Sequence, residues 1–263
     1  LRSRGLGDVY KRQVEIANVD GSDSKEITDT DYTLVKDLHE AGLPSSIKLS
    51  IDNVKTCAAA AGLDLNDGAT ITVTYTAHLN DKAAVNTADG ASNGENKNSV
   101  YLQYSNNPRI DTSLDHTTTS EVRVYTYQLN NTKYHDEDKP GNELEGAGFR
   151  LYSDEACNNE IKLKKNNDGT YSRDFSTGAS GVEMISDNKG QFNVKGLDAG
   201  TYYLKETTPP AGYSACADKE IVISATHTEY NVSLSGNLSN KIINKKAGGI
   251  TLPSTGGIGT TLF

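Results

Sequence analysis

The sequence predicts an all-β protein made of tandem Ig-like β-sandwich domains followed by a flexible tail. Its 263 residues include no Trp and one Met but 14 Tyr and 24 Gly, with abundant Thr, Val and Asn. This composition favours strands joined by tight turns. Short runs alternate between apolar and polar residues, as half-buried strands do. Only residues 58–61 favour a helix, and that patch is too short to form one. The length fits two domains.

The first half contains three clear strand candidates. Residues 47–51 and 71–77 alternate in polarity, and Asp67-Gly68 and Asn93-Gly94 mark turns near them. A last strand at residues 99–104 runs toward Pro108, which ends its pairing. Residues 1–13 are basic and unlike the acidic chain after them, so we predict an extraneous or disordered leader. The first domain then covers residues 14–120.

The second half repeats strands and turns at regular spacing. A Thr-rich connector, residues 112–120, leads into a strand at 122–127, and a hairpin-like turn follows at 167–170. The remaining strand candidates are residues 148–152, 190–194, 201–206, 221–223 and 241–244. This spacing is typical of a β-sandwich, and we assign the second domain to residues 121–247.

Charge and cysteine content exclude several functions. The net charge of -9 argues against a nucleic-acid-binding surface. Cys157 and Cys216 can form a disulfide, which would close a loop of roughly 60 residues and stabilise the folded state by ~4 kcal/mol. Cys57 is then left over and is expected to be a buried apolar residue. The cluster at residues 135–138 lacks calcium-loop spacing, and the chain has no HExxH, GxSxG or Walker motif. We therefore expect no metal, no cofactor and no turnover enzyme.

Five residues near the carboxyl end match an LPxTG sorting signal: Leu252, Pro253, Ser254, Thr255 and Gly256. This resemblance implies that a sortase cysteine attacks the carbonyl of Thr255, releases Gly256 onward and passes the acyl group to an amine. The polar, Gly-rich approach at residues 244–249 leaves the signal free to enter an enzyme cleft. Residues 257–263 begin an apolar run, so 248–263 is interpreted as a truncated sorting signal in a fragment of a secreted, wall-anchored protein.

Two motifs in the second half carry a more specific resemblance. Residues 190–213 include G-T-Y-Y-L-K-E-T-T-P-P-A-G-Y, and residues 144–152 read L-E-G-A-G-F-R-L-Y. The first resembles the E-box of Cna B-type domains in Gram-positive backbone pilins, and the second resembles the G-A-x-F strand of the same domains. The match covers nearly all of residues 121–247.

The pilin resemblance implies an intramolecular isopeptide bond. Carried over by position, Lys133 supplies the amine, Asn244 is the acceptor and Glu206 is the promoting acid. Alternation along a strand places Glu206 on an apolar face. Desolvation there favours a neutral amine and a protonated acid, and the acid is expected to hydrogen-bond the side-chain carbonyl of Asn244. Lys139 and Asn240 are the alternatives if a partner is misplaced.

The first half resembles the middle domain of backbone pilins through residues 31–34, 73–80 and 104–108. The resemblance implies that Asn106 or Asn107 accepts a second isopeptide bond from a first-strand lysine. That strand is expected before residue 14, so we predict an incomplete domain whose bond does not form. No pilin-motif lysine of the YPK type is found. The substitute lysines are Lys25, Lys36, Lys48 and Lys55.

Together these features predict a structural subunit of a sortase-assembled pilus, stabilised by its internal bond. Its expected partners are sortase, neighbouring pilin subunits, cell-wall peptidoglycan through sortase and host surface molecules. The alternative functions are the stalk of a wall-anchored adhesin and a surface protein that carries an enzymatic head elsewhere.

Overall fold

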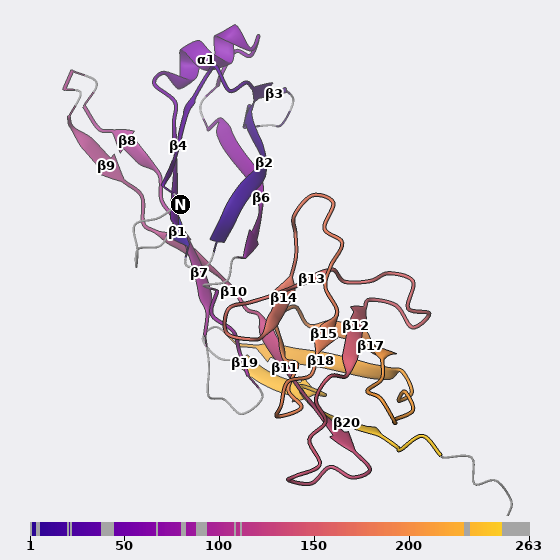
Figure 1. Ribbon diagram of the computed structural model, residues 1–263. Coiled ribbons are helices and arrows are strands. Elements are labelled where there is room, and N and C mark those ends of the chain that lie inside the picture. Colours follow the sequence, from indigo (N-terminus) through magenta and orange to yellow (C-terminus); the bar gives the residue numbers. More distant parts are fainter. Residues whose placement is uncertain are drawn as a thin grey trace, which may run out of the picture.

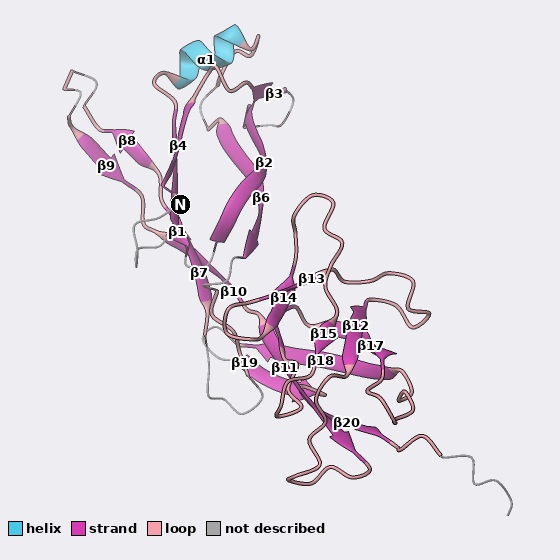
Figure 2. Cartoon of the chain, in the orientation of Figure 1, coloured by secondary structure: helices cyan, strands magenta, loops and turns pink. Residues whose placement is uncertain are grey.

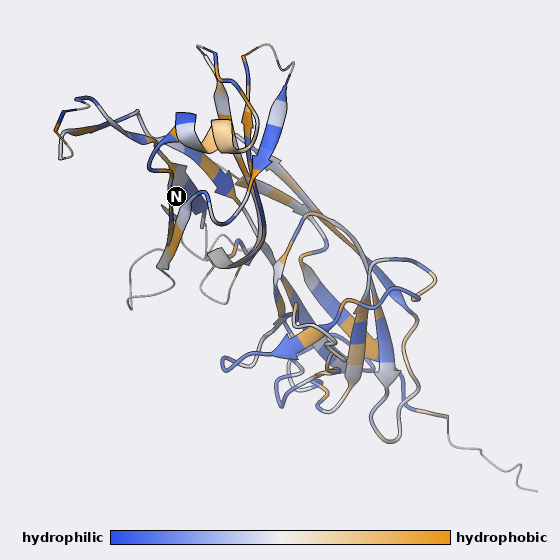
Figure 3. Ribbon diagram, turned by 90° about the horizontal axis from the view of Figure 1, so that it is seen from above, coloured by the Kyte–Doolittle hydropathy of each residue, from blue (hydrophilic) through white to orange (hydrophobic). Residues whose placement is uncertain are grey.

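The computed structural model contains two β-rich units in tandem (Figures 1 and 2). It describes residues 2–3, 6–19, 21, 23–37, 45–66, 68–79, 83–87, 94–107, 109–110, 112–228 and 232–248. Hydrophobic and hydrophilic residues alternate along many of the strands (Figure 3), as expected when one face of each sheet is buried. The predicted all-β fold is confirmed.

In its described residues, the first unit consists of two sheets, a hairpin and one short helix. One sheet has the order β10-β7-β1-β5-β4, the second has the order β3-β2-β6, and β8 pairs with β9. A small core of Val14, Ile16, Ile27, Cys57, Ala58 and Leu63 lies inside. The elements are β1 Arg2–Ser3, β2 Leu6–Ala17, β3 Ser24–Ile27, β4 Thr33–Asp37, β5 Ser45–Ser50, α1 Val54–Ala60, β6 Thr70–Leu79, β7 Asn96–Val100, β8 Gln103–Ser105, β9 Leu114–His116 and β10 Ser120–Val124.

The described residues of the leader expected at 1–13, namely 2–3 and 6–13, instead belong to strands of this unit. Strand β2 begins at Leu6 and pairs with β6 along most of its length. The basic residues of this segment suggested that it was foreign, but one of them, Arg12, has partners within the unit. Its guanidinium lies 2.6 Å from Asp29, and its Nε donates to the Tyr32 hydroxyl at 2.9 Å. A basic residue paired in this way fits an acidic domain.

Helix α1 also differs from the sequence-based expectation. It starts at Val54, before the patch at 58–61, because the Asn53 side chain caps it by accepting the Thr56 N–H at 3.0 Å. Its inner face buries Cys57 and Ala58, the former as predicted. Burial against the core stabilises a helix that is too short to persist alone.

The second unit is a sandwich of two five-stranded sheets, β13-β14-β16-β11-β20 and β15-β12-β17-β18-β19. Its core is larger and includes Phe149 stacked on Phe192, with ring centroids 4.3 Å apart. Strands β11 and β20 are parallel neighbours. The bounds are β11 Tyr127–His135, β12 Gly148–Tyr152, β13 Leu163–Lys165, β14 Tyr171–Arg173, β15 Met184–Ile185, β16 Val194–Leu197, β17 Gly200–Thr208, β18 Lys219–His227, β19 Val232–Gly236 and β20 Ser239–Asn244.

The strand expected at residues 122–127 is divided between the units. Strand β10 pairs with β7 of the first unit, whereas β11 begins at Tyr127. The change of sheet therefore falls at residues 125–126, a few residues beyond the predicted boundary at 120.

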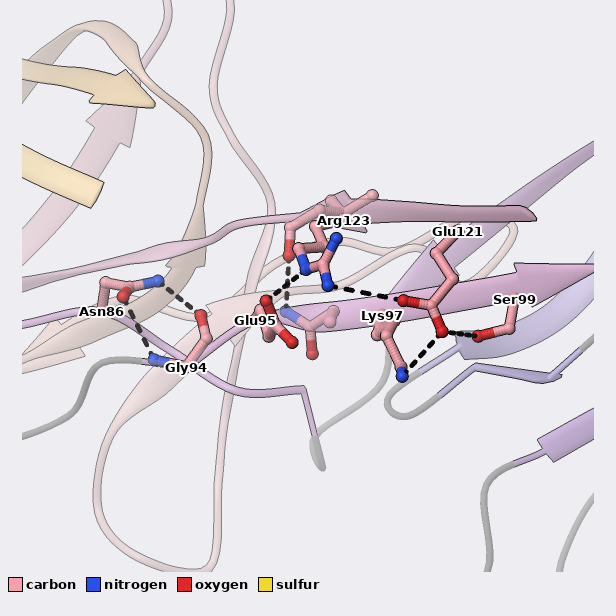
Figure 4. Close-up of polar contacts among 9 residues, drawn as sticks. Asn86, Gly94, Glu95, Lys97, Ser99, Glu121 and Arg123 are labelled. Atoms are coloured by element: carbon pink, nitrogen blue, oxygen red, sulfur yellow. Dashed lines mark hydrogen bonds and ion pairs between the residues drawn. The ribbon is translucent and has the colours of Figure 1, made fainter. Parts of the chain in front are cut away.

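Side chains of the first unit hold the connecting segment in place (Figure 4). Asn86 is buried, exchanges two hydrogen bonds with Gly94 and donates its backbone N–H to Thr126 O at 2.8 Å. Arg123 contacts Glu95 at 2.5 Å, and Lys97 contacts Glu121 at 2.9 Å. The junction between the units is thus fixed by hydrogen bonds to its backbone as well as by surface ion pairs.

Candidate functional site

Lys133, Glu206 and Asn244 meet inside the second unit. Lys133 lies on β11, Asn244 ends the neighbouring strand β20, and Glu206 lies on β17 in the facing sheet. In the parallel register Lys133 is opposite Ile242, and its side chain reaches diagonally to Asn244. The exposed fractions of the three residues are 0%, 6% and 1%. The core therefore encloses all three predicted site residues.

The distances join the three side chains into one network. Lys133 Nζ lies 2.5 Å from Asn244 Oδ1 and 3.4 Å from each carboxylate oxygen of Glu206. Asn244 Nδ2 donates to Glu206 Oε1 at 2.7 Å. The acid thus lies at the amide nitrogen of Asn244, and the amine at its carbonyl oxygen. This arrangement differs from the expected hydrogen bond between Glu206 and that carbonyl.

The surroundings fix the lysine backbone and exclude water. The Phe149 ring lies below Lys133 Nζ, with 5.1 Å between nitrogen and centroid. Lys133 N–H donates to Gly190 O at 2.8 Å. Gly190 has φ +71, and a Cβ there would lie 2.3 Å from Lys133 O. Glycine at the start of the E-box-like segment is therefore required both by its backbone conformation and by this close approach.

Burial makes the lysine a better nucleophile. Desolvation lowers the pKa of Lys133, although nearby Cys216 and Glu206 act in the opposite direction. A lowered pKa increases the fraction of neutral amine, which is the form that attacks a carbonyl carbon. The site therefore holds a lysine amine of lowered pKa against a carboxamide whose nitrogen faces a carboxyl group.

Cys216 belongs to this site, a role that the sequence did not indicate. Its backbone N–H donates to Glu206 Oε2 at 2.7 Å, so both oxygens of the acid have a donor. Desolvation raises the pKa of the Cys216 thiol to about 11, which keeps the thiol neutral. A cysteine ten residues beyond the E-box acid carries no recognisable motif.

The predicted disulfide between Cys157 and Cys216 is wrong, because all three cysteines are free. Cys157 lies in the turn after β12, where its Sγ is 3.7 Å from Glu155 O and 3.8 Å from Asp218. The Cys216 thiol instead lies toward Lys133 and Glu206. The two thiols thus have different surroundings.

The alternative residues occupy other environments. Lys139 is exposed and pairs with Glu137 at 2.7 Å. Asn240 is buried but bonds to Asn131. Asn106 and Asn107 lie in the β8–β9 hairpin, where they accept hydrogen bonds from Ser113 Oγ and from Arg109 N–H. In the described part of the chain, neither asparagine is hydrogen-bonded to a lysine. Lys25 lies 3.8 Å from Asp23.

The sorting motif, residues 252–256, lies outside the described residues. In the part of the chain that is described, no helix is long and apolar enough to cross a membrane. The same part contains no cluster of three or more His, Cys, Asp or Glu side chains arranged to hold a metal ion.

Comparisons with known proteins define the class of the second unit. Residues 127–237 match the family model of the SpaA prealbumin-like fold domain. These residues therefore form a prealbumin-like β-sandwich, and they include Lys133 and Glu206 of the buried network, whereas Asn244 lies seven residues beyond them. A search of curated proteins finds no significant match.

Over most of its length the chain has the same fold as solved major pilins. It is 18% identical to the 35 kDa C-terminal fragment of the major pilin GBS80 of Streptococcus agalactiae, with a TM-score of 0.59, covering 92% of this chain and 86% of that one. It is also 18% identical to the full-length major pilin SpaD of Corynebacterium diphtheriae, with a TM-score of 0.53, covering 94% of this chain and 56% of that one. The predicted resemblance to backbone pilins is confirmed.

Proposed function

We propose that this chain is a structural subunit of a surface pilus, and that Lys133 and Asn244 become joined by an isopeptide bond with Glu206 as the acid–base group. The observation that carries the proposal is the contact of 2.5 Å between Lys133 Nζ and Asn244 Oδ1 inside a closed core. A buried lysine is costly unless it is paired, and covalent capture would remove its charge permanently.

The chemistry needs only these three side chains. Neutral Lys133 attacks Cγ of Asn244 and forms a new C–N bond. Glu206 accepts the proton that the attacking nitrogen releases and passes a proton to Nδ2, which it already contacts at 2.7 Å. The old C–N bond then breaks and ammonia leaves. Held groups of this kind react as if at about 10⁵–10⁸ M, so a single turnover within the folded domain is sufficient.

The bond would lie on the direct line of load through the domain. The first unit is joined to β11, and the chain leaves the second unit after β20. Because β11 and β20 are adjacent and parallel, pulling on the two ends shears one strand along the other. A covalent bond between them would transmit the force without breaking the remaining strand pairs.

The carboxyl end supports a second element of the proposal. Residues Leu252 to Gly256 match the sorting signal, so the chain is proposed to be a sortase substrate cleaved after Thr255 and linked to a neighbouring subunit or to peptidoglycan. This places it on the surface of a Gram-positive cell wall. Incubation with a pilus sortase and a short amine should transfer the amine to Thr255, and Pro253→Ala should prevent this. A full-length chain that stays intact would contradict it.

The isopeptide bond is tested by intact mass. The full chain should weigh one ammonia less than its sequence requires, and a peptide map should join Lys133 to Asn244. Lys133→Met should restore the full mass, whereas Lys139→Met, at an exposed lysine, should retain the deficit. A parent protein at full mass would overturn the proposal.

A further inference from the structure

A second pair of buried polar side chains lies beside the site. Asn131 on β11 and Asn240 on β20 are 0% and 3% exposed and are direct partners in the parallel register. They share the inner face with Lys133 and Asn244, because buried residues alternate along both strands. The core positions next to the reacting groups therefore hold two carboxamides where aliphatic side chains would normally pack.

The two asparagines are bonded to each other and to the surrounding backbone. Asn240 Nδ2 donates to Asn131 Oδ1 at 3.1 Å and to Asn237 O at 2.8 Å. Asn131 Nδ2 donates to Phe192 O at 3.2 Å. Asn240 Oδ1 is buried without a hydrogen-bond partner. A buried amide with an unpaired oxygen lowers the stability of the fold. The presence of the two asparagines in the core therefore needs an explanation other than stability.

The advantage is a unique strand register. A slip of two residues preserves the inward-facing pattern of a strand and moves β20 by roughly 7 Å. In either direction such a slip places Asn131 opposite Leu238 or Ile242 and leaves buried amide groups unpaired. Aliphatic residues at both positions would accept these registers far more readily. A single buried Asn fixes register in coiled coils by the same mechanism.

Only the observed register supports the chemistry. Lys133 reaches the residue two positions beyond its cross-strand partner Ile242. After a slip in one direction that diagonal position is Ile242, and after a slip in the other it is Lys246. Neither residue has a carboxamide. A register error therefore places Asn240 or Asn244 directly opposite Lys133, and removes the acceptor from the diagonal position that the lysine side chain reaches.

We infer that Asn131 and Asn240 are positioning residues, which lock β20 against β11 so that Lys133 meets Asn244. The hydrogen bonds of the two asparagines support the register lock itself. Its effect on cross-linking rests on the proposed isopeptide bond. The pair acts before the covalent step and touches no reacting atom.

The first test is the rate of ammonia loss from the freshly folded full chain. Asn131→Leu/Asn240→Leu should lose ammonia on the order of 100-fold more slowly than the parent, the penalty of a small misplacement of reacting groups. Stability is compared without the isopeptide bond. The denaturation midpoint of Asn131→Leu/Asn240→Leu/Glu206→Ala should be no lower than that of Glu206→Ala alone. An unchanged rate would overturn the inference.

The second test measures register without the isopeptide bond. In the Glu206→Ala background, Thr132→Cys is combined with Lys241→Cys, its direct partner, or with Ile243→Cys, two residues away. With both asparagines present, mild oxidation should link only the 132–241 pair; with both replaced by Leu, the 132–243 pair should also form. Exclusive 132–241 linkage in both cases would overturn the register lock. A parent chain at full mass would instead refute the proposed function, while this second test still decides the register.

Discussion

Glu206→Ala removes the acid of the proposed site and should abolish the cross-link. Lys133 and Asn244 are 111 positions apart, so their bond would close a loop of about 110 residues. By the chain-entropy relation for cross-links, such a loop stabilises the folded state by about 5 kcal/mol. For a domain of roughly 120 residues this corresponds to a melting temperature lower by about 20 °C in the variant.

The same substitution also removes a buried hydrogen-bond acceptor. The Cys216 N–H now donates to Glu206 at 2.7 Å and would be left unpaired, at a cost of about 1–3 kcal/mol. Asn244→Ala separates the two effects, because it prevents the bond while Glu206 keeps its contact with Cys216. Glu206→Ala should therefore be less stable than Asn244→Ala by that amount.

The assay combines intact mass with thermal and urea unfolding of the full chain and both variants. The parent should show a deficit of one ammonia, and both variants should show the full mass and lower unfolding midpoints. A deficit that persists in Glu206→Ala would refute the role of the acid. Equal stability of the parent and both variants would refute the stabilising role of the bond.

Three further predictions concern titration and backbone conformation. Asn244→Ala cannot cross-link, so its Lys133 stays free to titrate, with a lowered pKa. Between that pKa and the ordinary value of about 10.4, the unfolded chain binds more protons than the folded one, and urea midpoints should therefore rise with pH across this range. A rise that persists in Lys133→Met/Asn244→Ala would contradict the assignment to Lys133. The pKa of Asp168 is lowered to about 2, mainly because Lys195 donates to it at 2.7 Å. NMR titration of Lys195→Met should show an Asp168 pKa nearer 3.8. An unchanged pKa would exclude the ion pair as the cause. Gly190→Ala should lower the free energy of unfolding by about 2–4 kcal/mol and leave cross-linking incomplete. Gly169 also has a positive φ, +82, but open space around it, so Gly169→Ala should cost only about 1–2 kcal/mol. Equal costs for the two variants would contradict the close approach at Gly190.

Several features depended on contacts between residues far apart in sequence. Helix α1 forms because Asn53 caps it and the core buries one face, although its local propensity is weak. The strand at the amino end was missed because its charged residues find partners only in the folded unit. Cys216 lies near Lys133 and Glu206 through the path of the segment between β17 and β18, which no pattern in the sequence encodes.

The sequence by itself determined the all-β class, because composition and alternation reflect local backbone preference and the burial of one face. Its motifs also determined the pilin resemblance and singled out Lys133, Glu206 and Asn244. Only the tertiary structure decided that these three side chains meet, that the acid faces the amide nitrogen, and that Asn131 pairs with Asn240. The parallel pairing of β11 and β20 joins residues more than a hundred positions apart, and strand register at that range depends on packing across the whole core.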